Sequence, residues 1–225
     1  MSDDLKRQAA LVALEEIRSG MVVGLGTGST ASHFIRELGA KVRNGLTVVG
    51  IPTSEASQHL AAEVGVPLTD FKKNPKIDVT VDGADEVSPE LDLIKGLGGA
   101  LVREKVVAHA SKRVIIVVDE SKLVDRLGAR TVIPVEAIPL AVDLVAAQLE
   151  SWGGQARIRE KDGKPFVSDN GNLILDWKHG AISQPAELER RIKALTGVVD
   201  SGIFAGVAQC VIVAGSSGCR KMEKP

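Results

Sequence analysis

The sequence contains no tyrosine, and aromatic residues make up only 3% of its 225 residues. Platforms on which nucleic-acid bases stack need exposed aromatic rings, so this composition disfavours binding to single-stranded DNA or RNA. Neither sign of charge is in excess, because 28 Lys and Arg residues are balanced by 29 Asp and Glu residues and the net charge is −1. A basic surface that would neutralise the phosphates of a duplex is therefore not expected.

Cysteines and long apolar runs are also scarce. The chain has only two cysteines, Cys210 and Cys219, which are too few for a disulfide framework and are typical of a reducing compartment. No apolar run approaches the roughly 20 residues that a membrane helix needs. The acidic start MSDDLKRQAA lacks the apolar core of a secretory signal. We expect a cytoplasmic protein that acts on a small molecule, with no membrane or nucleic-acid partner.

Apolar runs typical of strands alternate with helical patterns in the first half of the chain. Strands are expected near 21–25, 46–50, 77–82 and 113–118, with helices before and between them. The run Val114–Val118 contains only β-branched apolar residues, as in a strand that is covered on both faces. This alternation predicts an α/β fold with a Rossmann-like, mostly parallel sheet and helices on both faces.

The pattern changes near Gly128. Strands are expected near 131–135, 155–160, 173–176 and 198–202, with helices that begin at Pro139 and Pro185. This β-α-β-β-α-β order is that of a ferredoxin-like α+β domain. The apolar run 209–214 is expected to return to the first sheet. The sequence thus predicts a catalytic domain formed by 1–128 and 203–225, with an inserted domain over 129–202 that provides an oligomer contact.

A glycine-rich turn, Gly24 to Thr30, joins the first expected strand to a helix. Backbone N–H groups at a helix start and the helix dipole favour an anion, and Ser29 and Thr30 add hydroxyl donors. The turn lacks the third glycine of a dinucleotide fingerprint and the Gly-Lys-Ser/Thr of a Walker A loop. It is either a phosphate site that implies no nucleotide or a plain strand-to-helix turn with Ser29 as the N-cap.

Three acids and a lysine stand out between residues 82 and 105. Asp82 and Asp85 follow the expected strand 77–82, Lys95 precedes a cluster of glycines, and Glu104 lies in a helical pattern. Ligands bind at the carboxyl ends of strands in open α/β sheets, and glycine lets the backbone approach a ligand closely. The alternatives are a metal site or a turn cap for the aspartates, an exposed lysine, and a solvated helix face for Glu104.

Together, in their order and spacing, these blocks resemble ribose-5-phosphate isomerases of the A type over nearly the whole chain. The resemblance implies interconversion of ribose 5-phosphate and ribulose 5-phosphate in the pentose phosphate pathway, without a metal or an organic cofactor, by a homodimer or homotetramer. The blocks that carry it are Leu5-Lys6, Gly24–Thr30, Val81–Glu86, Lys95–Leu101, Arg103–Lys105, Asp119–Lys122, Pro134–Pro139, Asp169–Asn172 and Gly197–Val199.

The resemblance also implies roles for individual residues. The sugar phosphate would be bound by a turn that comprises Thr27, Gly28, Ser29 and Thr30, with a contribution from Lys6, and Lys122 would be a further substrate contact. The sugar site would be lined by Asp82, Gly83, Ala84, Asp85, Lys95, Gly96, Leu97 and Gly98. Glu104 would be the base that moves the carbon-bound proton, Lys95 would stabilise the oxyanion, and Asp82 or Asp85 would handle hydroxyl protons and opening of the sugar ring.

Two other functions remain open at this point. A non-catalytic sugar-phosphate sensor would need the phosphate turn but neither Glu104 nor Lys95. An enzyme similar to the coenzyme A transferases would use a glutamate as its nucleophile. Activity on ribose 5-phosphate in the absence of metal and coenzyme A would separate an isomerase from both.

Overall fold

The computed structural model describes residues 3–224, so that Met1, Ser2 and Pro225, which the predicted catalytic domain includes, lie outside the described residues. Two compact units form. Unit 1 runs through Ala84 and includes Arg103–Lys122 and the chain from Val207 on, and unit 2 comprises Asp85–Val102 and Leu123–Gly206. Unit 2 thus holds more than the segment 129–202. Because compactness does not test which segments fold as domains, the predicted domain division stays a prediction.

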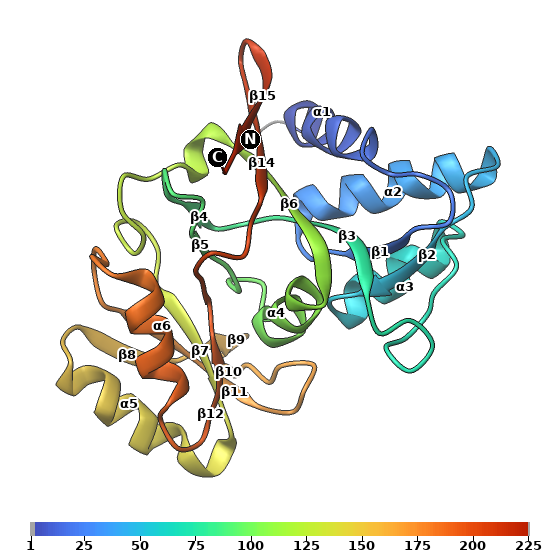
Figure 1. The fold of residues 1–225 in the computed structure, drawn as a ribbon. Coiled ribbons are helices and arrows are strands. Elements are labelled where there is room, and N and C mark those ends of the chain that lie inside the picture. The colour runs from blue at the N-terminus through green and yellow to red at the C-terminus, as the bar shows by residue number, and fades with distance from the viewer. Residues whose placement is uncertain (1–2, 225) are drawn as a thin grey trace. The chain divides into compact units, whose positions relative to one another are not determined.

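Unit 1 contains a six-stranded sheet with the order β15-β14-β6-β3-β1-β2 (Figure 1). Neighbouring strands pair in parallel, except for the antiparallel hairpin of β14 and β15. The predicted mostly parallel sheet, and the return of residues 209–214 to it, are therefore confirmed. The strands are β1 (Val22–Leu25), β2 (Val49–Pro52), β3 (Ile77–Asp82), β6 (Ser111–Asp119), β14 (Cys210–Gly215) and β15 (Gly218–Glu223).

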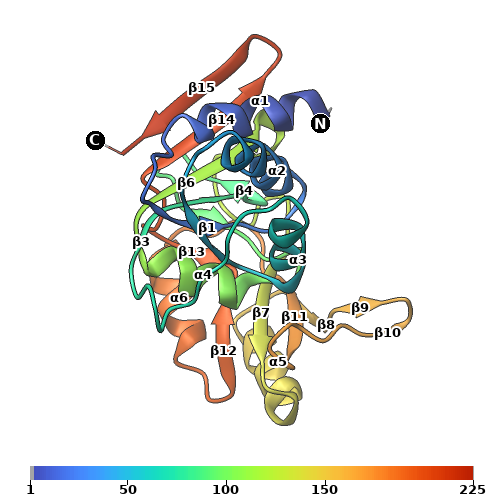
Figure 2. The ribbon, with the colours of Figure 1, turned by 90° about the vertical axis from the view of Figure 1, so that its right-hand side faces the viewer.

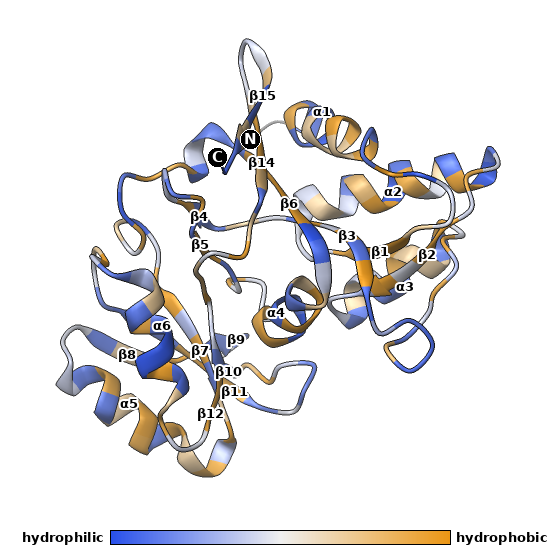
Figure 3. Cartoon of the chain, viewed as in Figure 1, coloured by the Kyte–Doolittle hydropathy of each residue, from blue (hydrophilic) through white to orange (hydrophobic). Residues whose placement is uncertain are grey.

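Helices cover both faces of this sheet, as predicted. On one face, α1 (Asp3–Leu14) and α2 (Ser29–Arg43) bury a core in which Phe34 and Leu38 pack with Val23 of β1. On the other face, Val22 of β1 packs with Val107 of α4 (Leu101–His109). Alternate residues of β1 therefore pack on opposite faces of the sheet. Because both faces are covered, the whole strand must be apolar. Figure 3 shows the hydrophobic colour along β1 and β2.

Three local features of unit 1 show how far the sequence patterns reach. Ser54 caps α3 (Glu55–Glu63) by accepting the N–H of Ser57. Ser29 is not the N-cap of α2, because Gly28 takes that position with φ of 101° and Ser29 is the first helical residue. Strand β15 was not predicted, because its mostly polar sequence has no apolar run and it lies at the edge of the sheet.

Unit 2 contains a four-stranded antiparallel sheet with the order β12-β7-β11-β8, part of which Figure 2 shows from the side. This order, with two helices between its strands in the chain, is the predicted ferredoxin-like arrangement. Its core includes Leu149, Trp177 and Ile192. The elements are β7 (Ile133–Ala137), the 3-10 helix η2 (Pro139–Ala141), α5 (Val142–Ser151), β8 (Gln155–Ile158), β11 (Leu173–Lys178), α6 (Pro185–Lys193) and β12 (Val198–Ser201).

Five shorter strands of unit 2 were not predicted, because two residues are too few to show a periodicity. Three of them, β4 (Glu86–Val87), β5 (Leu93–Ile94) and β13 (Ile203–Phe204), form a small antiparallel sheet. The other two, β9 (Glu160–Lys161) and β10 (Lys164–Pro165), form a hairpin. Among residues 3–224, no helix is both long enough and apolar enough to cross a membrane.

A buried carboxylate, that of Glu86, fixes the loop that leads into β7. Its side chain is 1% exposed. The two oxygens accept the backbone N–H groups of Gly128, Arg130 and Thr131 at 2.5, 2.8 and 2.7 Å. A carboxylate that accepts several backbone donors in a buried site holds their loop strongly.

Replacing Glu86 by alanine should therefore destabilise the protein. The substitution leaves three backbone N–H groups without their acceptor, one of them the buried N–H of Gly128, and we expect a loss of about 3 kcal/mol. Calorimetric unfolding measures this loss. The exposed Glu90 offers a matched control, for which Glu90→Ala should change stability by less than about 0.5 kcal/mol. Equal unfolding midpoints for the two variants would contradict this account of Glu86.

Candidate active site

Four neighbouring strands of unit 1, β2, β1, β3 and β6, run parallel and end at the same edge of the sheet. The glycine turn follows β1, residues 82–84 end and follow β3, and a short 3-10 helix, η1 (Glu120–Lys122), follows β6. This edge therefore brings together three groups of predicted site residues, at 27–30, 82–84 and 122. The carboxyl edge of a parallel sheet is the usual ligand site of such folds.

The carboxylate of Asp82 joins two of these strand ends. Its Oδ1 accepts the N–H of Thr27 at 3.0 Å and the N–H of Gly83 at 2.7 Å, and the side chain is 2% exposed. Gly26 leaves the room for this arrangement, since a Cβ there would lie 2.4 Å from Asp82 Oδ1. A glycine at position 26 is thus required by close backbone approach.

The N-terminus of α2 is open toward this edge. Gly28 and Ser29 are exposed, and within the described chain no side chain caps the helix. The first N–H groups of a helix have no partner inside it, and the helix dipole adds positive potential at that end. This arrangement can bind an anion such as a phosphate group.

A cluster of hydroxyl groups holds Thr27, and the sequence patterns did not reveal it. Thr27 Oγ1 lies 2.7 Å from Thr53 Oγ1, 2.8 Å from Ser54 Oγ and 3.2 Å from Ser57 Oγ. Thr53, Ser54 and Ser57 are at most 5% exposed. They follow β2, the parallel neighbour of β1, so knowledge of the strand order would have placed them beside the turn.

Lys6 and Lys122 lie on α1 and on η1, respectively. Lys6 belongs to α1, and its Nζ lies 3.8 Å from Asp3 Oδ1. Lys122 ends η1, where the Ser121 N–H donates to Asp119 Oδ1 at 2.8 Å. The structure places Lys122 at a strand end, whereas the contribution of Lys6 to phosphate binding stays a prediction.

Glu104 does not lie on a solvated helix face, which was the plain alternative for it. It occupies the first turn of α4 and is only 4% exposed. The preceding residue, Arg103, forms an ion pair with Glu55 at 3.8 Å. Because Glu55 begins α3, between Ser54 and Ser57 of the hydroxyl cluster, the start of α4 lies beside the start of α3 in unit 1.

In unit 2, Asp85 and the glycine loop that follows Lys95 are held together. The N–H of Leu97 donates to Asp85 Oδ2 at 3.0 Å, and the N–H of Asp85 donates to the Ile94 carbonyl at 2.8 Å. Gly96 and Gly99 have φ of 99° and 86°, in the left-handed region that favours glycine. Asp85, Lys95, Gly96, Leu97 and Gly98 thus form one local group.

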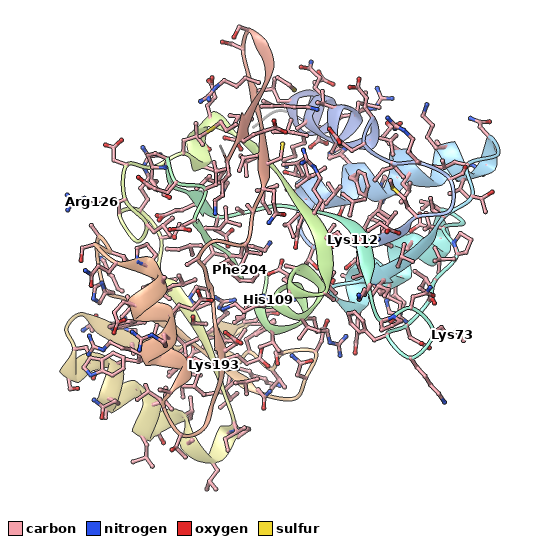
Figure 4. The ribbon with its side chains drawn as sticks, in the orientation of Figure 1. Lys73, His109, Lys112, Arg126, Lys193 and Phe204 are labelled. Carbon is pink, nitrogen blue, oxygen red and sulfur yellow. The ribbon has the colours of Figure 1, made fainter. Side chains whose placement is uncertain are left out.

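Lys95 is buried, with 3% of its surface exposed. Its Nζ lies 5.6 Å from the centroid of the Phe204 ring, which Figure 4 labels on β13. Its N–H donates to the Gly202 carbonyl at 2.8 Å. A Cβ at Gly202 would lie 2.2 Å from the Lys95 carbonyl oxygen. The lysine backbone is therefore fixed by strand contacts, and its charged group lies next to an aromatic ring.

Within the described residues, no group of three or more His, Cys, Asp or Glu side chains is arranged to hold a metal ion. The alternative in which Asp82 and Asp85 form a metal site thus gains no support from their neighbours. Asp82 instead accepts the Thr27 N–H of the glycine turn, and Asp85 accepts the Leu97 N–H of the loop that follows Lys95.

Comparisons with known proteins identify the family. Residues 49–218 match the sequence profile of the family described as ribose 5-phosphate isomerase A (phosphoriboisomerase A). The chain is 48% identical to the ribose-5-phosphate isomerase A of Bradyrhizobium diazoefficiens, covering 99% of this chain and 96% of that protein. It is 51% identical to the protein of the same name from Methanothermobacter thermautotrophicus, covering 96% of each.

Solved structures give the same result. The structure of ribose 5-phosphate isomerase A from Methanocaldococcus jannaschii matches with a TM-score of 0.95 at 42% identity, over 100% of both chains. A structure of a D-ribose-5-phosphate isomerase in complex with phospho-erythronic acid matches with a TM-score of 0.97 at 41% identity, again over 100% of both chains. The α/β fold, the edge of the sheet and the full-length similarity lead to one conclusion: the chain belongs to the ribose 5-phosphate isomerase A family.

Proposed function

We propose that this chain interconverts D-ribose 5-phosphate and D-ribulose 5-phosphate through an enediolate, with Glu104 as the base and Lys95 as the electrostatic stabiliser. The observation that carries this proposal is the burial of both charged side chains, at 4% and 3% exposure. Removing a charge from water is costly, and buried ionisable groups are concentrated at functional sites. Family membership supplies the substrate.

The phosphate turn would bind the unreactive end of the substrate. Residues 27–30 offer helix N–H groups and hydroxyl groups. The turn is held in place at Thr27 by hydrogen bonds with Asp82 and with the hydroxyl cluster of Thr53, Ser54 and Ser57. Binding energy from a remote phosphate can align the reacting carbons. Lys6 and Lys122 would add positive charge.

At the reacting end, the Glu104 carboxylate would take the proton from C2 of the open-chain aldose. The electron pair of that C–H bond forms the C1–C2 double bond, and the carbonyl oxygen at C1 becomes an oxyanion. Lys95 and backbone N–H groups of the 96–98 loop would stabilise this oxyanion. Return of the proton to C1 gives the ketose, while Asp82 or Asp85 moves hydroxyl protons and assists ring opening.

Turnover of ribose 5-phosphate tests this proposal. The purified chain should form ribulose 5-phosphate in a coupled assay with EDTA present and coenzyme A absent. Glu104→Gln should lower kcat by about 10²- to 10⁴-fold, the usual contribution of a general base, with little change in KM. Glu63→Gln, which alters a carboxylate with 68% side-chain exposure, is the control. An inactive wild-type chain would leave the sensor as the better function, and near-normal turnover of Glu104→Gln would remove Glu104 as the base.

Lys95→Met tests the electrostatic role, because methionine keeps most of the aliphatic length and removes the charge. We expect kcat to fall by about 10²- to 10³-fold, as for other positioned donors to an oxyanion. Steady-state kinetics with ribose 5-phosphate separates kcat from KM. If KM alone rose, Lys95 would contact the ground state and would not stabilise the transition state.

We further propose that the chain acts in the cytoplasm as a homodimer or a larger homo-oligomer. Unit 2 exposes large apolar side chains beside its sheet, with Leu140 at 92% and Leu144 at 76% exposure. They are four residues apart, with Leu140 in η2 and Leu144 in the first turn of α5, and Ile138, 41% exposed, lies just before η2. Clustered exposed apolar side chains favour association, and the occupant we propose is a second copy of this chain.

Light scattering coupled to gel filtration tests this assembly. The wild-type chain should elute with at least twice the single-chain mass of 23.7 kDa. The double variant Leu140→Glu and Leu144→Glu should shift toward the single-chain mass, because charges in a dry apolar interface are unfavourable. Leu68→Glu, at a 37% exposed leucine in unit 1, should leave the mass unchanged. A single-chain mass for the wild type would overturn the assembly.

A further inference from the structure

One side chain of unit 2, Arg159, contacts the loop that follows Lys95. Arg159 lies between β8 and the β9–β10 hairpin, more than 60 residues along the chain from this loop. Its Nη1 donates to the carbonyl oxygens of Gly96 at 2.8 Å and Leu97 at 3.0 Å. A single guanidinium nitrogen thus contacts two consecutive peptides of the loop.

Arg159 is itself firmly held. Its Nε and Nη2 donate to both oxygens of the Asp176 carboxylate on β11, in the two-point geometry that suits arginine. Its backbone N–H donates to the Ile174 carbonyl at 2.7 Å, and its side chain is only 11% exposed. An ion pair with this geometry and burial differs from the mobile surface pairs that contribute little.

The same contacts fix the direction of the loop peptides. The C=O and N–H of a trans peptide point in opposite directions. The peptide between Gly96 and Leu97 therefore has its C=O on the Arg159 cation and its N–H on the Asp85 anion. In the next peptide the Leu97 C=O contacts Arg159, so the N–H of the exposed Gly98 points away from the guanidinium.

Charge on the carbonyl side also affects the donor side. Hydrogen bonds in series polarise one another, so a cation on a C=O strengthens the N–H of the same peptide as a donor. The aromatic ring of Phe166 adds a steric wall, because a Cβ at Gly99 would lie 2.5 Å from it. The Arg159 guanidinium lies 6.0 Å from the centroid of the same ring.

We propose that Arg159, fixed by Asp176, is a positioning residue for the isomerisation: it orients and polarises the 96–98 peptides so that the N–H of Gly98, beside Lys95, faces the developing oxyanion. This inference rests on the proposed function. Arg159 donates to carbonyl groups of the loop, so it acts through the loop. The loop that Arg159 positions would stabilise the enediolate and would not bind the phosphate. Replacing Arg159 should therefore change kcat more than KM.

Kinetics of arginine variants, with ribose 5-phosphate as substrate, provides the test. Arg159→Ala should lower kcat by about 10- to 100-fold, since small displacements of positioned groups have effects of this size, and should leave KM within about twofold. Arg159→Lys keeps the charge but loses the planar guanidinium with its several donors. Its kcat should therefore lie between that of Arg159→Ala and that of the wild type. Arg157→Ala removes an exposed arginine two residues away, whose recorded side-chain partner is Gln155, and should behave as wild type.

An inhibitor of the reacting end gives a second readout. Phospho-erythronic acid carries a carboxylate where the enediolate develops charge, so its inhibition constant should rise in Arg159→Ala by about the same factor as kcat falls. The inhibition constant of inorganic phosphate, which needs only the phosphate turn, should not change. Asp176→Asn, which leaves Arg159 in place but removes its charged partner, should give an intermediate loss of kcat.

The outcomes separate this inference from the proposed function. An inactive wild-type chain overturns the proposed function and, with it, any role of Arg159 in it. An active wild-type chain whose Arg159→Ala variant keeps kcat within about twofold overturns the inference alone. If Arg159→Ala does not fold, Arg159→Lys decides. A kcat that falls only in step with the folded fraction measured by calorimetry, with unchanged phospho-erythronic acid inhibition, shows a purely structural arginine and also overturns it.

Discussion

The carboxylate of Asp82 is the contact on which the candidate site of unit 1 depends. Its Oδ1 accepts backbone donors from the glycine turn after β1 and from the end of its own strand. In a buried site such charge-assisted bonds are strong, and leaving the donors unsatisfied would be costly. The glycine turn, for which we propose phosphate binding, is therefore fixed by β3, with Gly26 providing the necessary space.

The sequence patterns identified those site residues that directly follow an expected strand. The turn at 27–30 and the acids after β3 follow apolar runs directly, so their place at the sheet edge followed from the parallel fold. The hydroxyl cluster did not, because it depends on β2 being the neighbour of β1. Arg159 did not either, because its contact with the Gly96 carbonyl spans 63 residues and nothing in a turn-rich segment indicates it.

Burial was the second limit of sequence reasoning. The triplet Arg103-Glu104-Lys105 has the composition of a solvated helix face, yet Glu104 and Lys105 are at most 5% exposed. Local patterns report only the preferences of one helix, whereas burial is decided by the surfaces that the helix meets. The long apolar strand β6 was predictable for the opposite reason, since a β-branched run fits only a strand covered on both faces. The two-residue strands of unit 2 carried no pattern at all.

The loop after Lys95 is supported by a residue that is distant along the chain. Gly96 and Gly99 allow its left-handed backbone, but glycine also gives a chain the greatest freedom to lose on folding. A loop built to expose N–H groups must have its carbonyl groups satisfied from the other side. Arg159 donates to two carbonyl groups of this loop, and the Asp176 carboxylate holds its guanidinium in place. A glycine-rich loop can therefore still be rigid. The glycines make its left-handed backbone conformation accessible, and the hydrogen bonds from Arg159 stabilise that conformation.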